Sequence, residues 1–410
     1  MSITDDIRTN RFHDFTVRLD NGAISGGSPG TEGRALPRTA GVRQTDHAFW
    51  FGSNVFKLVR DPNEPGMKQY RNAVTHLWNF GTLPFYWGRY EPVEGEPMEA
   101  ATMAAATWAR ENGLTTKGHP LCWHTVCADW LLQYDNDTIL QKQIERVYRE
   151  VGRFAGLIDM WDVINEVVIM PSFDKYDNAV TRIANHVGAV ELTLQLFRTA
   201  RQANPGATLL INDFNLSPDY ERLIEELLER DCPIDAIGLQ SHQHKGYHGI
   251  EYTLDVIDRF SRFGKPLHFT ETTILSGHPV PPQIVDLNDY QIDEWPSTPE
   301  LEERQAEQVA QYYSAIYSRP ETAAIVWWDL QDGNWLGAPS GLLRRDMSPK
   351  PAYDRLHSLI KGEWWLDKQE VPVGPDGAVR FTGTAGTYEI EIDGTVRSVE
   401  LGRDATAAAV

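Results

Sequence analysis

The chain has few cysteines, few basic residues and no long apolar stretch, and each shortage excludes a class of protein. Its three cysteines, Cys122, Cys127 and Cys232, follow no repeated spacing, which argues against a disulfide framework, a zinc ribbon and a thioredoxin-like motif. No apolar run reaches the roughly 18 residues that a membrane-spanning helix needs. The N-terminus has no apolar signal core and carries adjacent acids at Asp5 and Asp6. We therefore expect a cytoplasmic protein, or a secreted one if a signal has been removed.

Basic residues are outnumbered by acidic ones. The 410 residues include 38 Lys and Arg against 58 Asp and Glu, a formal net charge of −20. Such a surface repels nucleic-acid phosphates and anionic membranes. We expect neither as a partner and favour a neutral or cationic small molecule.

Short apolar runs alternate with longer amphipathic stretches between residues 47 and 360, which predicts parallel strands joined by crossover helices. The eight strand candidates are 48–55, 82–87, 115–123, 158–165, 208–213, 236–241, 267–271 and 324–330. The clearest helix candidates are 138–153, 190–203, 219–230, 252–263 and 299–317. Eight such units predict an α/β fold of the (β/α)8 or TIM-barrel type, with chemistry at the carboxyl ends of the strands.

The two ends of the chain carry a different pattern. Residues 15–19 alternate like a strand, and the Gly-, Ser- and Pro-rich stretch 22–33 predicts turns or a flexible loop. The C-terminal strand candidates are 380–383, 387–392 and 396–401. Residues 404–410 are expected to fray. The predicted parts are a β segment at 1–46, a barrel at 47–362 and a β-rich segment at 363–410, the terminal strands forming a small sheet against the barrel.

Two predicted strands end on a glutamate. Residues 161–166 read WDVINE and residues 266–271 read PLHFTE. In a barrel both glutamates would stand at the mouth, where Glu166 and Glu271 can face each other. Retaining glycosidases need two carboxyl groups about 5 to 5.5 Å apart, one as nucleophile and one as acid and then base. The amide of Asn165 could bind a sugar 2-hydroxyl beside them.

Each of these residues also has a simpler interpretation. Either glutamate alone could be a solvated residue at the start of a loop, and His119 or His124 could be a core histidine with its hydrogen bonds satisfied. His242, His244 and His248 could be a metal site, yet no Cys or Asp set accompanies them. We predict neither a metal ion nor a cofactor.

Several motifs together resemble glycoside hydrolase family ten, the retaining endo-β-1,4-xylanases, along residues 47–360. WDVINE is similar to the acid/base signature of that family, and HFTET at 268–272 is similar to its nucleophile strand. Further similar segments are GHPLCWH at 118–124, NDFN at 212–215, IGLQSH at 237–242, and the pair Trp327 and Trp335.

The resemblance implies a role for each motif residue. Glu166 would be the acid/base and Glu271 the nucleophile, with His242 hydrogen-bonded to Glu271 to hold it ionised. Glu166 needs a raised pKa to arrive protonated, most simply through a nearby carboxylate. The implied sugar-binding residues are Asn54, Lys57, Trp123, His124, Asn165 and Gln240, with Trp327 and Trp335 as an aromatic wall.

The chain also departs from the pattern of the family. Ser53 stands before Asn54 where the family has Glu, so a carboxylate for the next sugar outward is missing. Val126 replaces a usual Gln and Thr273 a common Asp, while 327–329 read WWD in place of Trp-Gly, which leaves the register open by one residue. The catalytic groups are kept and the glycone side changes, which predicts an altered substrate preference.

We therefore predict a retaining glycoside hydrolase that cleaves β-1,4-xylosidic bonds in xylan or xylo-oligosaccharides by double displacement, with a β-linked oligo- or polysaccharide as its partner. One alternative is a retaining β-glycosidase of the same fold with a different glycone. The other is a non-catalytic glycan-binding protein with a Trp-lined groove, although binding alone would not require Glu166 and Glu271 together. The sequence leaves endo or exo action and the oligomeric state open.

Overall fold

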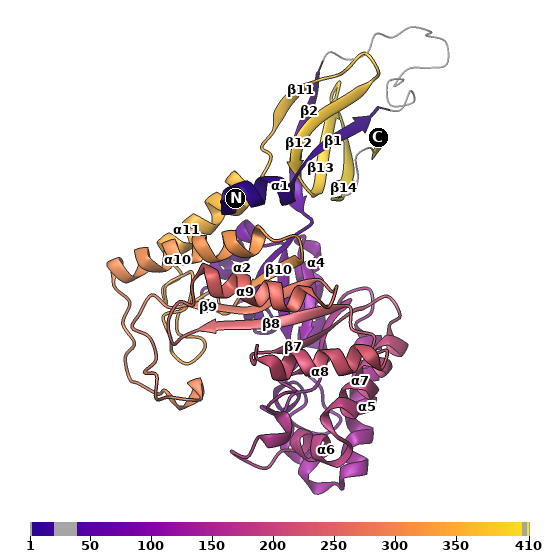
Figure 1. Ribbon diagram of the computed structural model, residues 1–410, viewed down its shortest axis with the longest axis vertical. Coiled ribbons are helices and arrows are strands. Elements are labelled where there is room, and N and C mark those ends of the chain that lie inside the picture. Colours follow the sequence, from indigo (N-terminus) through magenta and orange to yellow (C-terminus); the bar gives the residue numbers. More distant parts are fainter. Residues whose placement is uncertain (1, 20–38, 404–407, 410) are drawn as a thin grey trace.

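Eight parallel strands close a barrel in the computed structural model, which describes residues 2–19, 39–403 and 408–409 (Figure 1). The order around the barrel is β10-β3-β4-β5-β6-β7-β8-β9, so its first and last strands pair with each other. The strands are β3 Trp50–Asn54, β4 Phe80–Pro84, β5 Thr115–His119, β6 Met160–Asn165, β7 Thr208–Asp213, β8 Ala236–Gln243, β9 Leu267–Ile274 and β10 Thr322–Trp327. The predicted TIM barrel is confirmed.

The predicted strand ranges all overlap the observed ones, and the differences lie mostly at their ends. β7 matches its predicted range at both ends, whereas β5 stops at His119 because Pro120 has no N–H to continue the ladder. β8 and β9 run on to Gln243 and Ile274. These two strands therefore carry polar side chains beyond the point where the apolar pattern ends.

Helices join the barrel strands and form its outer layer (Figure 1). The helices are α2 Met67–Leu77, α3 Trp87–Tyr90, α4 Glu99–Glu111, α5 Asn136–Arg153, α6 Ala179–Val187, α7 Ala189–Ala203, α8 Pro218–Glu229, α9 Ile250–Ser261, α10 Pro299–Tyr317 and α11 Pro351–Ser358. The short 3-10 helices are η1 Phe56–Val59, η2 Asp129–Gln133, η3 Met170–Ser172 and η4 Leu287–Asp289, and η5 Leu359–Glu363 is a short π-helix. Asp135 and Thr298 cap α5 and α10 by accepting from Thr138 N and Leu301 N. No helix in the described part of the chain combines the length and apolar character needed to cross a bilayer.

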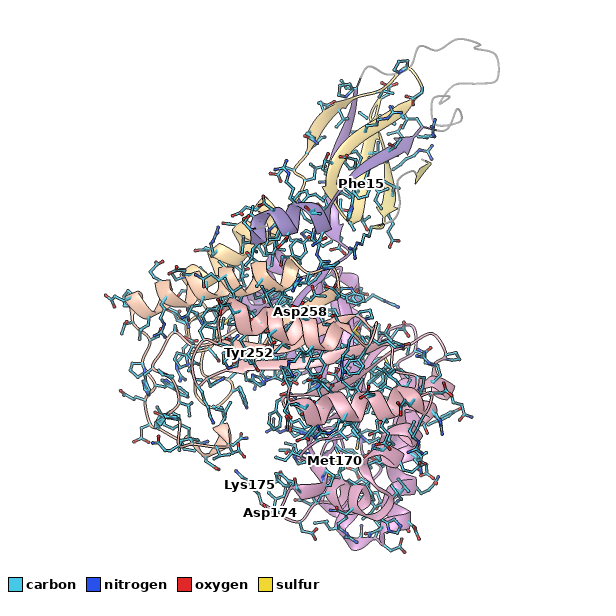
Figure 2. The ribbon with its side chains drawn as sticks, viewed as in Figure 1. Phe15, Met170, Asp174, Lys175, Tyr252 and Asp258 are labelled. Atoms are coloured by element: carbon cyan, nitrogen blue, oxygen red, sulfur yellow. The ribbon has the colours of Figure 1, made fainter. Side chains whose placement is uncertain are left out.

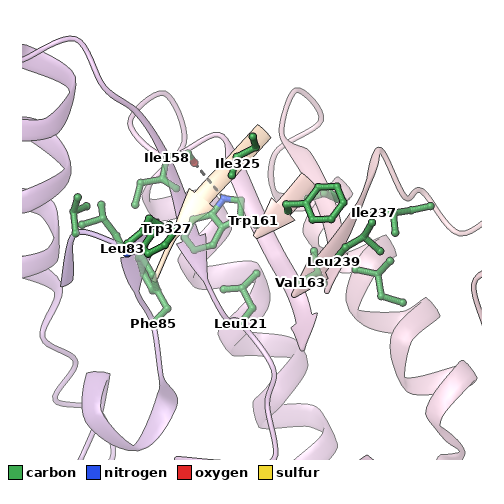
Figure 3. Close-up of a cluster of buried hydrophobic side chains, with 14 of the residues drawn as sticks. Leu83, Phe85, Leu121, Ile158, Trp161, Val163, Ile237, Leu239, Ile325 and Trp327 are labelled. Carbon is green, nitrogen blue, oxygen red and sulfur yellow. Dashed lines mark hydrogen bonds between the residues drawn. The ribbon is translucent and has the colours of Figure 1, made fainter. Parts of the chain in front are cut away.

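The strands of the barrel are buried on both faces, as their continuous apolar sequences predict (Figure 3). Trp161 lies between β6 and the helices, where Phe85 packs edge-on against it with ring centroids 4.8 Å apart. A Cβ at Gly118 on β5 would lie 2.2 Å from the Trp161 ring, so this position requires glycine. The strand that ends at the catalytic candidate Glu166 is thus fixed by packing.

The two ends of the chain meet in two small sheets above the barrel in Figure 1. One sheet has the order β12-β1-β15 and the other β11-β2-β13-β14. Their strands are β1 Phe12–Arg18, β2 Thr39–His47, β11 Gln369–Pro372, β12 Ala378–Thr384, β13 Gly386–Ile392, β14 Thr395–Leu401 and β15 Ala408–Ala409. Phe15 and Val42 from the N-terminal part share one apolar core with Tyr388 and Ile390 from the C-terminal part. The predicted small sheet is therefore a two-sheet sandwich built from both ends.

Two expectations for the ends were wrong. The first residues form a helix, α1 (Ile3–Arg11), because Ser2 and Asp5 make a reciprocal capping box. Of residues 404–410, which were expected to fray, Ala408–Ala409 pairs with β1, and residues 404–407 and 410 lie outside the described residues. The predicted loop at 22–33 lies outside the described residues.

Candidate active site

Glu166 stands directly after β6 in an uncommon backbone conformation. Its φ of +58° is a left-handed value that is costly for a residue with a side chain. Its N–H donates to the backbone oxygen of Asn212 at the end of β7 over 2.8 Å, which holds this conformation. The carboxylate accepts from Trp123 Nε1 at 2.7 Å and from Gln240 Nε2 at 3.2 Å. Two donors therefore fix its orientation.

Glu271 lies within β9, and 6% of its side chain is exposed. Its Oε1 accepts from Asn212 Nδ2 at 2.8 Å, and its Oε2 lies 3.1 Å from His242 Nε2. His119 Nε2 lies 3.9 Å from Oε1. Donors and potential positive charge surround this carboxylate, which favours its ionised form.

A chain of side-chain amides connects the two glutamates. Gln240 Nε2, which reaches Glu166, also donates to Asn165 Oδ1 at 3.1 Å. Asn212 Nδ2, which reaches Glu271, donates to the same Asn165 oxygen at 2.8 Å. Both bonds end on Oδ1 of Asn165, so its Nδ2 donor is directed elsewhere and can serve a substrate hydroxyl.

The two glutamates have pKa values shifted in opposite directions. Burial raises the pKa of Glu166, and the negative charges of Glu271 and Asp213 raise it further, to about 8. Burial also raises the pKa of Glu271, but the charge of His119 and the hydrogen bond from His242 outweigh it and leave that pKa below its usual value. These shifts favour a protonated Glu166 and an ionised Glu271 at neutral pH.

A buried ion pair contacts His119, the histidine beside Glu271. Lys117 Nζ lies 2.6 Å from Asp162 Oδ2, and the same oxygen lies 2.8 Å from His119 Nδ1. Burial raises the pKa of Asp162, but Lys117 and His119 lower it below the usual value. The sequence analysis did not assign these residues, although alternate positions on β5 place Lys117 and His119 on one face of the strand. That spacing was the available signal.

The tryptophans near the end of β10 have different surroundings. Trp327, predicted for an aromatic wall, is completely buried, and its Nε1 donates to Ser340 O at 3.0 Å, so it packs in the core. Trp328 is 5% exposed, and its ring centroid lies 5.3 Å from that of His119 and 6.2 Å from that of His242. The ring centroid of Trp335 lies 4.3 Å from that of His242. Because two tryptophans are adjacent in WWD, the sequence alone could not show which of them matches the Trp of the Trp-Gly pattern.

The side of the site nearest β3 and β10 is polar. Asn54 Nδ2 donates to Asp329 Oδ1 at 2.7 Å, and Lys57 donates to Gln331 Oε1. Ser53 is buried, and its hydroxyl donates to the backbone oxygen of Asn54. Asn54 and Lys57 thus each contact a residue of the segment after β10, Asp329 and Gln331 respectively.

Other predicted positions have less direct contacts with the glutamates. His124 is buried beside Phe173, with ring centroids 4.5 Å apart, and burial lowers its pKa to about 4, so it is neutral. Val126 lies in the loop after β5. Thr273 Oγ1 lies 3.4 Å from His242 Nδ1. A neutral hydroxyl thus neighbours His242 where the resemblance has a carboxylate.

The histidines considered as metal ligands have other neighbours. His242 faces Glu271, and His248 packs against Tyr252 with ring centroids 4.9 Å apart. Within residues 2–19, 39–403 and 408–409, no group of three or more His, Cys, Asp or Glu side chains could hold a metal ion.

The chain is similar to curated proteins named as xylanases. Endo-1,4-beta-xylanase C of Paenibacillus barcinonensis is 25% identical over 380 residues, which cover 82% of this chain and 33% of the relative. Endo-1,4-beta-xylanase/feruloyl esterase of Xylanibacter ruminicola is 25% identical over 315 residues, which cover 70% of this chain and 42% of the relative. The chain thus spans less than half the length of these curated relatives.

A solved structure shares the fold. A GH10 protein from Paenibacillus barcinonensis superposes with a TM-score of 0.63 at 24% identity, over 77% of this chain and 96% of that one. The family model described as "Glycosyl hydrolase family 10" matches residues 84–359, more than half of the 410 residues. This match includes both glutamates and the amides between them. The chain belongs to glycosyl hydrolase family 10.

Proposed function

We propose that the protein is a retaining glycoside hydrolase that cleaves β-1,4-xylosidic bonds in xylan or xylo-oligosaccharides. The observation that carries the proposal is the pair of glutamates with opposite pKa shifts, joined through Asn165, Gln240 and Asn212. An acid that keeps its proton beside a carboxylate that has lost its own is what retaining hydrolysis requires.

In the first step, a carboxylate oxygen of ionised Glu271 attacks the anomeric carbon, and the bond from that carbon to the glycosidic oxygen breaks. Protonated Glu166 gives its proton to the leaving oxygen, so the departing sugar leaves as a neutral alcohol. The product is a glycosyl ester on Glu271. Nδ2 of Asn165 is placed to donate to a hydroxyl beside the reacting carbon, a bond that strengthens as positive charge develops there.

In the second step, Glu166 is ionised and its higher proton affinity makes it a base. It takes a proton from a water molecule, whose oxygen attacks the anomeric carbon and displaces Glu271. Two displacements at one carbon return the original configuration. The step needs no electron carrier or metal ion, because two carboxyl groups and water balance the reaction.

The substrate class rests on the relatives and on the polar groove residues. The two curated relatives described above are named endo-1,4-beta-xylanases. A xylose unit offers hydroxyls to Asn165, Asn54 and Lys57 and an apolar face to Trp335. We therefore propose a β-linked xylosaccharide as the substrate.

Product analysis tests the proposal. Wild type, Glu166→Gln and Glu271→Gln are incubated with xylan, xylo-oligosaccharides, cello-oligosaccharides and aryl β-glycosides. We expect xylo-oligosaccharide cleavage by wild type, β-anomers as the first products in proton NMR, and a loss of more than about 1000-fold in Glu271→Gln. An α-anomer as the first product would exclude double displacement, and binding without cleavage would favour the glycan-binding alternative.

A second candidate is the same retaining chemistry on a different glycone. It is favoured by Ser53, where the resemblance places a sugar-binding glutamate, and by the buried Asp329 beside Asn54. Faster cleavage of cello-oligosaccharides or of another aryl glycoside than of the xylosides would select this candidate.

A further inference from the structure

Asp329 is a buried carboxylate that the proposed reaction does not use. It follows Trp328 after the end of β10, and 7% of the residue is exposed. A buried carboxylate is costly unless it is paired or hydrogen-bonded. Its Oδ1 accepts a hydrogen bond from Asn54 Nδ2 at 2.7 Å. The carboxyl ends of barrel strands are where the functional residues of such barrels lie, so this position indicates a functional role for Asp329.

Asp329 follows Trp328, whose ring centroid lies 5.3 Å from that of His119 and 6.2 Å from that of His242, the two histidines beside Glu271. The hydroxyl of Tyr86 has its pKa raised by burial first and then by the negative charges of Glu271, Asp329 and Glu166. Tyr86 therefore lies within electrostatic range of all three carboxylates. His242 contacts Glu271, and its charge also lowers the pKa of the Asp329 carboxyl.

The neighbouring strand explains the position of this carboxylate. Trp327 pairs with Ser53 in the ladder between β10 and β3, and just beyond this pair the side-chain amide of Asn54 reaches the carboxylate of Asp329. With Trp328 rather than Trp327 in the wall, Asp329 occupies the place of the glycine in the Trp-Gly pattern. A carboxylate absent at Ser53 is thus present on the adjacent strand, at the same Asn54 amide.

We propose that Asp329 is a substrate-binding residue that selects the glycone, its carboxylate accepting hydrogen bonds from hydroxyls of a sugar bound between β3 and β10. The inference rests on the proposed function and deepens it. Asn54 positions the Asp329 carboxylate by donating from Nδ2 to its Oδ1. Lys57, which donates to Gln331, lies on the same side of the site. A sugar unit supplies the hydroxyl donors that a carboxylate, which only accepts, requires.

The state of Asp329 without substrate agrees with this role. Burial raises its pKa to about 6, although the hydrogen bond from Asn54 and the charge of Lys57 act in the opposite direction. The free pocket therefore stabilises the charge incompletely. Hydroxyl donors of a bound sugar would complete this stabilisation. A glycone without those hydroxyls would leave the buried carboxylate unpaired and would bind more weakly.

The test compares Asp329→Asn and Asp329→Gly with wild type on aryl β-xyloside, aryl β-xylobioside and glycones lacking one hydroxyl. We expect KM to rise about 10-fold or more on the hydroxylated substrates, with kcat within about 3-fold, because a hydrogen bond to a charged group is lost from binding. The penalty for the missing hydroxyl should shrink in both variants. An unchanged penalty in both variants would overturn the proposal and reduce Asp329 to a residue that positions Asn54.

A rescue variant separates binding from folding. Combining Ser53→Glu with Asp329→Gly returns a carboxylate to the Asn54 amide from β3, and KM should move back toward the wild-type value. The matched control is Asp332→Asn, which alters a carboxylate paired with Lys350 in the same loop. It should lower the melting temperature and leave KM unchanged, whereas a KM rise equal to that of Asp329→Asn would contradict the assignment.

Failure of the proposed function gives a different result. If wild type cleaves none of the aryl glycosides, the hydrolase proposal fails, and xylobiose binding by calorimetry then tests Asp329 alone. Weaker binding by Asp329→Gly than by wild type supports the residue, and equal binding rejects it.

Discussion

The charge states of Glu166 and Glu271 set the pH dependence of the reaction. The pKa of Glu166 is raised to about 8, and that of Glu271 is lowered from its usual value. Activity needs Glu166 protonated and Glu271 ionised, so kcat/KM should fall above about pH 8 and, on the acid side, only below the ordinary range of a glutamate. Initial rates on an aryl β-xyloside across pH 3 to 10, in roughly half-unit steps, measure both limbs.

A change of leaving group serves as the control for this profile. A dinitrophenyl leaving group departs without a proton, so the alkaline limb should weaken on that substrate and Glu166→Gln should keep most of its glycosylation rate. On substrates with poor leaving groups, the same variant should lose about 100- to 10,000-fold. An alkaline limb near pH 5 on every substrate would contradict the raised pKa of Glu166.

Gly238 controls the amide that reaches the nucleophile. A Cβ at this position on β8 would lie 2.4 Å from Asn212 Oδ1, so Gly238→Ala must push the Asn212 side chain away from Glu271. We expect kcat to fall about 100-fold, the effect of roughly 1 Å of misplacement at a catalytic group, while circular dichroism keeps its native form. Gly206→Ala, where the nearest atom to a Cβ is 3.6 Å away, is the control and should keep full activity.

Helix α1 is an element that stabilises the barrel from the N-terminal side. Arg11 at its end donates to the backbone oxygens of Tyr317 at 2.6 Å and Thr322 at 3.0 Å, where α10 ends and β10 begins. Arg11→Ala leaves these part-buried oxygens without their charged donor and should cost about 1.5 to 3 kcal/mol of unfolding free energy. Urea denaturation measures the loss. Arg8→Ala, an exposed change in the same helix, should stay within about 0.5 kcal/mol of wild type.

Two loops on different sides of the barrel mouth are joined by exposed ion pairs. Lys175, after β6, lies 2.5 Å from Asp286 and 2.9 Å from Asp289 in the segment between β9 and α10 (Figure 2). Exposed pairs contribute about 0 to 1 kcal/mol, so Lys175→Ala should barely change the melting temperature. It should, however, speed protease cleavage of the segment that contains η4, because local opening needs little free energy there.

A surface pair elsewhere provides the control for the loop experiment. Lys368 lies 2.6 Å from Glu391 on the sandwich. Lys368→Ala removes a comparable exposed pair and should leave cleavage near η4 at the wild-type rate. Equal acceleration in both variants would show that the effect is not local to the two loops.

These elements also show which features the sequence predicts. The barrel strands follow from apolar runs, and Glu166 and Glu271 follow from polar residues at the ends of those runs. Helix α1 was missed because its nine residues have a weak apolar face, although Ser2 and Asp5 carried the capping signal. The roles of Asp162 and Asp329 depend on partners on other strands, at a distance that local patterns do not encode. The choice between Trp327 and Trp328 was decided by packing alone.

At the scale of the whole molecule, the sandwich needs both ends of the chain. β1 pairs with β12, and β2 pairs with β11 and β13, so both of these N-terminal strands depend on partners from the C-terminal part. We propose limits near residues 46 and 362 between these terminal parts and the barrel.

Truncation tests whether the two ends depend on each other. Removing residues 368–410 takes away β11 to β15 and leaves Phe15, Val17 and Val42 of β1 and β2 without the residues that bury them. Exposed strand edges and apolar faces promote aggregation, so this variant should be less soluble and lose melting temperature. Removing residues 2–47 as well deletes those strands but also Arg11, so the double truncation should be soluble yet less stable than the full chain. If the C-terminal truncation alone stays monomeric in size-exclusion chromatography with the wild-type melting temperature, the two ends do not depend on each other for stability.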